Sequence, residues 1–126
     1  MKTPQHLLLA LIAVFAPVKA AVLTAIVLVL ADLITGLMAA HKRGDPITSS
    51  GIKTTVAKIM LYEVAILLGF LVQHYLTEGI LPVCNLITSV IGLTEITSIL
   101  ENLQTINPAV SWTSLVSRFT KTKDQI

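Results

Sequence analysis

Three acidic residues stand in stretches of sequence that are otherwise apolar: Asp32, Glu63 and Glu95. A carboxylate at the centre of a bilayer costs about 2.5–3.5 kcal/mol on insertion scales, so it needs a partner, a proton or water. Such a group either packs against polar groups inside a helix bundle or faces a subunit interface or an aqueous lumen. The sequence leaves both interpretations open, and we favour the second.

Polar and small residues recur along the third of these stretches, mostly at steps of three and four. They are Asn85, Thr88, Ser89, Gly92, Glu95, Ser98, Glu101 and Asn102. On a helix this spacing predicts one stripe, whose small residues permit close helix approach and whose polar residues can bond across a contact or be wetted. We therefore predict that the stripe lies at an oligomer interface or lumen. The candidate residues on the other two stretches are Asp32, Thr35, Gly36 and Glu63.

The second stretch also has a packing face, on which polar and small residues follow one another at steps of three and four. These residues are Lys58, Tyr62, Ala65, Gly69 and Gln73. A packing face on each stretch is compatible with a single bundle and indicates an oligomer.

Enzymatic and metal chemistry find no support in the sequence. The three histidines have no metal-ligand spacing to one another or to Cys84, and neither a Gly-rich phosphate loop nor a nucleophile elbow occurs. A single cysteine excludes an internal disulfide. The formal net charge of +2 is too weak to indicate a nucleic-acid surface. We expect no catalytic residue, metal, cofactor or nucleic-acid partner.

The elements that position these residues follow from composition. The chain has 126 residues, of which 54% are hydrophobic and 13% charged, whereas soluble domains have roughly 25% charged residues. Mean hydropathy is +0.82. These values predict one all-α membrane domain over residues 1–126. Its three transmembrane helices lie within 20–102, at about 20–40, 53–75 and 82–102, each long enough to cross a bilayer.

Local signals predict where these helices begin and end. Gly44 is placed to end the first helix, and Ser49 or Ser50 is a suitable N-cap for the second. Residues 77–79 form a tight turn, and Pro82 suits the first turn of the third helix.

Both ends of the chain are expected to form short interfacial helices. Residues 1–19 are apolar and interrupted by Pro17; they also resemble a signal peptide, but we favour a retained helix at the outer interface or a kinked extension of the first crossing. Residues 103–126 form an amphipathic cytoplasmic tail, because apolar residues recur there at i, i+3, i+4 and i+7. Its predicted membrane-anchoring residues are Trp112, Arg118, Phe119, Lys121 and Lys123.

Basic residues predict the orientation. Seven of them fall in the first loop with its flanks and in the tail: Lys42, Arg43, Lys53, Lys58, Arg118, Lys121 and Lys123. Only Lys2 and Lys19 fall on the other side, and the turn at 77–79 has none. The positive-inside rule therefore predicts an N-terminus outside and a cytoplasmic C-terminus.

Three short motifs make the chain resemble the toxin-secretion/phage-lysis holin family. They are Asp-Leu-Ile-Thr-Gly at 32–36, Ser-Ser-Gly-Ile-Lys at 49–53 and Ser-Ile-Leu-Glu-Asn at 98–102. The resemblance covers about residues 20–108 in the family's order. The family usually continues with a glycine and a Pro-rich stretch, of which only Asn107 and Pro108 remain here, and the apolar N-terminus and the Trp112 helix depart from its pattern.

The resemblance implies a protein that accumulates in the cytoplasmic (inner) membrane of a bacterial host. There it self-associates into lesions through which a murein-degrading endolysin, or in some relatives a toxin, crosses, and the host lyses. Composition and periodicity by themselves predict only the membrane, the stripes and an assembly. Two other classes stay open: a small ion or proton channel or transporter, and a non-conducting structural membrane protein.

Overall fold

The computed structural model describes residues 3–109, 111, 117–118 and 121, and it is helical with no strand among them. The helices are α1 (Thr3–Phe15), α2 (Lys19–Arg43), α3 (Ser49–Leu71) and α4 (Val83–Ile106), with a 3₁₀ turn η1 (Ala16–Val18) and a π-helical turn η2 (Val72–Leu76). The all-α prediction is confirmed.

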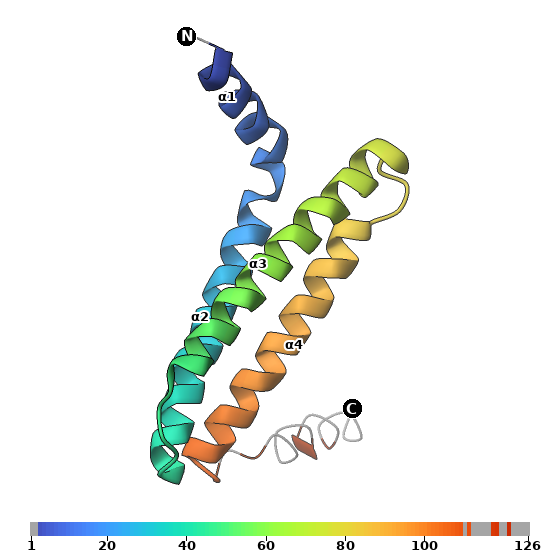
Figure 1. Ribbon diagram of the computed structural model, residues 1–126. Coiled ribbons are helices and arrows are strands. Elements are labelled where there is room, and N and C mark those ends of the chain that lie inside the picture. Colours follow the sequence, from blue (N-terminus) through green and yellow to red (C-terminus); the bar gives the residue numbers. More distant parts are fainter. Residues whose placement is uncertain (1–2, 110, 112–116, 119–120, 122–126) are drawn as a thin grey trace.

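Three helical segments are long and apolar enough to cross a membrane. They are Pro4–Arg43, Ser49–Leu76 and Val83–Ile106. Helices α2, α3 and α4 lie side by side, and α3 runs antiparallel to the other two (Figure 1). The chain is a multi-pass membrane protein, as predicted.

The bundle has a narrow core and an apolar exterior. The buried cluster consists of Val18, Ala25, Ile66, Phe70, Cys84 and Ile91. Many large apolar side chains, such as Leu23, Val27 and Leu68, are exposed. In water such a surface would drive association, whereas in a bilayer lipid tails solvate it and tight packing holds the helices together.

A glycine permits α3 and α4 to approach each other closely. A Cβ at Gly69 on α3 would lie 2.6 Å from Ile87 Cδ1 and 3.4 Å from Cys84 Cα on α4. Beside this contact, the side-chain oxygen of Gln73 accepts a hydrogen bond from the backbone N–H of Cys84 at 2.9 Å. Gln73 thus satisfies one of the N–H groups that the start of a helix leaves unpaired.

The N-terminal segment continues α2 through a kink, and its place in the membrane stays a prediction. The kink falls in η1, where Pro17 has no N–H to donate to the preceding turn. Above it α1 diverges from the bundle (Figure 1), while Phe15 at its base makes a ring contact with Phe70 at 6.1 Å. The 40 residues of Pro4–Arg43 would span roughly 60 Å as a straight helix, twice the hydrocarbon core.

The predicted helix ends are correct in part. Gly44 ends α2 in the left-handed conformation, at φ 78°, as expected. The N-cap of α3 is Thr48 and not Ser49 or Ser50, which are the first two helical residues. Pro82 directly precedes α4 instead of lying in its first turn.

Candidate functional site

One ionisable residue from each crossing helix meets the others inside the bundle. Lys58 Nζ on α3 lies 2.8 Å from Asp32 Oδ2 on α2 and 3.1 Å from the Glu95 carboxylate on α4. The side chains are 30%, 15% and 0% exposed, respectively. A single ammonium therefore bridges two carboxylates and ties the three helices together.

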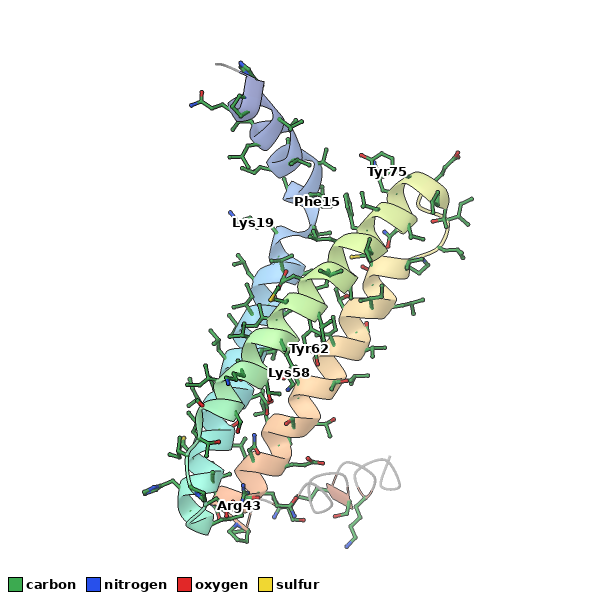
Figure 2. All side chains as sticks on the ribbon, in the orientation of Figure 1. Phe15, Lys19, Arg43, Lys58, Tyr62 and Tyr75 are labelled. Atoms are coloured by element: carbon green, nitrogen blue, oxygen red, sulfur yellow. The ribbon has the colours of Figure 1, made fainter. Side chains whose placement is uncertain are left out.

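Neutral side chains complete this ion network. Tyr62, one turn beyond Lys58 on α3 (Figure 2), donates its hydroxyl to Glu95 Oε1 at 2.7 Å. Ser98 Oγ donates to Asp32 Oδ1 at 2.6 Å, and Asn102 Nδ2 donates to the same oxygen at 3.0 Å. Each carboxylate thus has neutral donors besides the lysine, as buried ions require.

Formal charges in the network do not cancel. Asp32 and Glu95 contribute two negative charges when ionised and Lys58 one positive charge, which leaves a net charge of −1. The excess is tolerable because the network is not sealed. A polar groove of about 380 Å³ runs to Asp32 and Lys58 from the loop that joins α2 to α3. Hydroxyl groups line its wall: Thr48, Ser50, Thr54, Thr55 and Ser98. Water can reach the ions from this end of the bundle.

The α2 motif residues belong to the same cluster. Thr35 Oγ1 accepts a hydrogen bond from Asn102 Nδ2 at 3.1 Å. Gly36 faces the same amide, because a Cβ there would lie 3.5 Å from Asn102 Nδ2. The two predicted motifs at 32–36 and 98–102 are therefore joined across the α2–α4 contact.

The predicted stripe on α4 does not form one face. Glu95, Ser98 and Asn102 point into the bundle, while Asn85, Ser89 and Glu101 are exposed and Gly92 is half-buried. Ser89 donates its hydroxyl only along its own helix, to Asn85 O at 2.7 Å. The six residues from Ser89 to Glu95 turn the helix by about 600°, which places the two side chains roughly 120° apart.

Glu63 takes no part in the ion network. It lies on α3 in a groove of about 300 Å³ beside the base of α1 and the start of α2. The other lining residues are Leu11, Ile12, Phe15, Lys19, Val22 and Leu67. Its Oε1 is buried and has no hydrogen-bond partner among the described residues.

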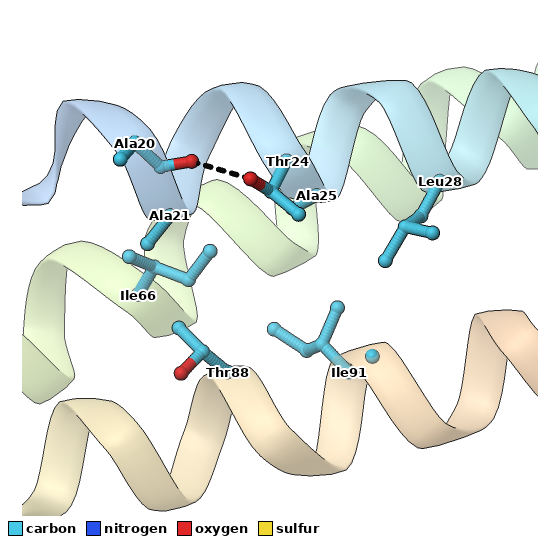
Figure 3. Close-up of a pocket in the computed structure, with 9 residues that line it drawn as sticks. Ala20, Ala21, Thr24, Ala25, Leu28, Ile66, Thr88 and Ile91 are labelled. Atoms are coloured by element: carbon cyan, nitrogen blue, oxygen red, sulfur yellow. Dashed lines mark hydrogen bonds between the residues drawn. The ribbon is translucent and has the colours of Figure 1, made fainter.

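A third groove, of about 290 Å³ and mostly apolar, lies between α2 and α4 (Figure 3). Small residues such as Ala21, Ala25 and Gly92 line it, together with Thr24 and Thr88. The Thr24 hydroxyl is engaged with its own helix, at 2.7 Å from Ala20 O.

Sequence reasoning did not place Lys58 and Tyr62 among the site residues. Both lie on the predicted packing face of the second helix, which was the available signal. Lys58 was instead assigned to the basic residues of the first loop and its flanks.

The tail is described only in part. Arg118 and Lys121 are exposed. Trp112, Phe119 and Lys123 lie outside the described residues, so their predicted anchoring role stays a prediction. At the end of α4, Lys42 Nζ donates to the carbonyl of Ile106 and joins the ends of α2 and α4.

Comparison with known proteins identifies the family. The sequence model of the bacteriophage holin family matches residues 9–118, which include all three crossing helices and the ion network. Comparisons with curated proteins and with solved structures gave no match. The chain therefore belongs to the bacteriophage holin family, whose members are pore-forming membrane proteins and not enzymes.

Proposed function

We propose that copies of this holin assemble in the inner membrane of the bacterial host into a lesion through which endolysin or a toxin crosses. The main observation is the exposed polar surface of α4. Asn85 and Ser89 point out of the bundle amid exposed apolar side chains such as Leu86 and Val90. Lipid tails offer polar groups no hydrogen bond, whereas a second copy or water can.

The predicted site residues divide into two groups under this proposal. Asp32, Thr35, Gly36, Glu95, Ser98 and Asn102 bond or pack within one copy. Glu63, Asn85, Ser89, Gly92 and Glu101 are left for contacts between copies or for the lumen. The first group keeps each subunit folded, and the second assembles subunits.

The proposed orientation has the N-terminus outside and the C-terminus in the cytoplasm. Lys58 no longer supports it as a loop residue, because its ammonium lies in the ion network. Six basic residues then remain inside (7 − 1) against two outside, so the sign of the asymmetry is unchanged. The polar groove would accordingly open toward the cytoplasm.

The two ends of the chain are proposed to lie at membrane surfaces. The part of the predicted tail 103–126 that follows α4, residues 107–126, rests on the cytoplasmic surface, where Arg118 and Lys121 meet anionic headgroups. Helix α1 lies in the outer interface, because its exposed leucines, among them Leu7, Leu8 and Leu11, need lipid or protein to cover them. Together with the bundle they form one domain.

Release of a folded enzyme tests this function. The holin is expressed in a bacterial host together with a murein-degrading enzyme that has no export signal of its own. Abrupt lysis that depends on both proteins is the expected result. Proton flux without lysis, measured with a pH-sensitive dye, would instead indicate a small channel. Neither flux nor lysis at full membrane abundance would indicate a structural protein.

A further inference from the structure

Glu63 lacks the hydrogen-bond donors that Asp32 and Glu95, the carboxylates of the ion network, have. Asp32 and Glu95 accept hydrogen bonds from Lys58, Tyr62 and polar side chains of α4. Glu63 Oε1, in contrast, is buried and has no hydrogen-bond partner among the described residues. Apart from Glu63 itself and the exposed Lys19, which makes no ion pair with Glu63, its groove is lined by apolar side chains. A lipid tail that filled this groove would supply no donor, so the natural occupant has a hydrogen-bond donor at the depth of Glu63.

The Gly69 contact shows which residues of α4 lie at the same membrane depth as Glu63. Gly69 lies against Cys84 and Ile87, and α3 and α4 are antiparallel. Six residues back along α3 from Gly69 to Glu63 correspond to six residues forward along α4. The matching level is therefore between residues 90 and 93 (84 + 6 and 87 + 6). Ser89 is within about 2–6 Å of that level at 1.5 Å per residue, and Gly92 is on it.

The two features lie on different sides of one subunit. Glu63 occupies the groove between α3 and α2, whereas Gly92 lines the groove between α2 and α4 and Ser89 is exposed beside it. Copies inserted in the same orientation keep all residues at the same depth. The Glu63 side of one copy can therefore meet the Ser89 side of the next, and the contact can repeat around a closed ring.

We propose that Glu63 of each copy accepts a hydrogen bond from Ser89 of its neighbour. The groove that contains Glu63 in one copy then contacts the Asn85–Ser89–Gly92 face of α4 in the next copy, a head-to-tail arrangement. This inference rests on the assembly proposed above and specifies its geometry. The Ser89 hydroxyl turns its hydrogen from Asn85 O to the carboxylate, and Gly92 lets the two helices approach closely.

Disulfide cross-linking between two differently labelled copies tests the contact. In a Cys84→Ser background, one population has Leu67→Cys, on the Glu63 groove, and the other has Asn85→Cys. We expect oxidation to link the mixed populations in membranes and to leave each population alone unlinked. Val90→Cys is the matched control, because it is exposed and close to Ser89 in depth but about 140° around α4 from Asn85. Linking of Leu67→Cys to itself, or an equally strong link from Val90→Cys, would overturn the proposed contact.

Side-chain variants then test the hydrogen bond itself. Glu63→Leu and Ser89→Ala should each weaken self-association in lipid by about 3- to 30-fold, the range of single hydrogen bonds between membrane helices. Glu63→Gln keeps an acceptor and should associate like the parent. Lys19→Gln should also leave association unchanged. A loss of association equal to that of Glu63→Leu would show that Lys19, and not Ser89, is the donor to Glu63.

These outcomes separate the contact from the function. Lysis with oligomers that link through other faces would refute the Glu63–Ser89 contact and leave the holin proposal standing. A parent protein that stays monomeric in membranes during lysis would refute the assembly itself.

Discussion

The bridging lysine gives the sharpest prediction about what stabilises one subunit. Lys58→Met keeps the length and apolar stem of the side chain and removes its charge. At an effective dielectric constant of about 20, each ion contact near 3 Å is worth roughly 5–6 kcal/mol before desolvation. Without the ammonium, two carboxylates held within about 5 Å repel each other by roughly 3 kcal/mol, unless one takes up a proton.

The net cost is smaller than the sum of the two contacts, because removal of Lys58 also removes its own desolvation. Loss of one partner of a buried ion pair costs about 3–5 kcal/mol. Since the Lys58 side chain is 30% exposed, we take the lower end, about 3 kcal/mol, which raises the unfolded fraction roughly a hundredfold. Glu95→Gln should cost about 1 kcal/mol or less, because its amide oxygen still accepts a hydrogen bond and the network becomes neutral.

Unfolding free energies measured by steric trapping in mild detergent check this order. Lys53→Met is the matched control, because Lys53 is an exposed lysine on the same helix. The double variant Lys58→Met with Glu95→Gln should recover part of the loss, since the repulsion between carboxylates is gone. A Lys58→Met protein within about 0.5 kcal/mol of the parent, which is the size of an ordinary surface substitution, would refute the reasoning. A Glu95→Gln protein less stable than Lys58→Met would refute it as well.

Three further predictions concern topology, packing and the tail. In a Cys84→Ser background, Glu78→Cys should react with an impermeant thiol reagent from outside only, and labelling from the cytoplasm would reverse the orientation. Gly69→Ala should destabilise the bundle by about 1–3 kcal/mol, because its Cβ meets a side chain of α4 at 2.6 Å, while Gly51→Ala, which meets nothing within 4 Å, should not. Truncation after Asn107 should leave membrane fractionation intact and alter lysis timing or assembly, and loss of insertion would contradict the three-crossing topology.

The three crossing helices could be predicted from the sequence. Their observed ends differ from the predicted ends for a physical reason. The first crossing was predicted at 20–40 and α2 is Lys19–Arg43; the third was predicted at 82–102 and α4 is Val83–Ile106. A run of apolar residues shows only which part of a helix lies in the hydrocarbon core, and not where the helix ends. Backbone hydrogen bonding continues into the polar flanks until a residue such as Gly44 ends it.

The partners of the ionisable residues could not be predicted in the same way. Steps of three and four put Ser89 and Glu95 on one broad stripe, although a three-helix bundle buries only the narrow side that includes Glu95. Lys58 is 26 residues from Asp32 and 37 from Glu95. Pairing over such distances depends on the helix register, which composition and periodicity do not determine.

A single bridging lysine separates folding from assembly in this bundle. Lys58 and its neutral neighbours satisfy Asp32 and Glu95, so these two carboxylates stabilise a lone subunit. Glu63 Oε1 has no hydrogen-bond partner in the described part of that subunit, and its desolvation only costs free energy until a donor arrives. Replacing Glu63 with leucine should therefore leave the isolated bundle as stable or more stable while it weakens association. Lys58→Met should destabilise the isolated bundle in detergent, where subunits are kept apart, and should leave association in lipid unchanged. If both variants reduced stability and association in the same proportion, the carboxylates would form one system, and the division between folding and assembly would be wrong.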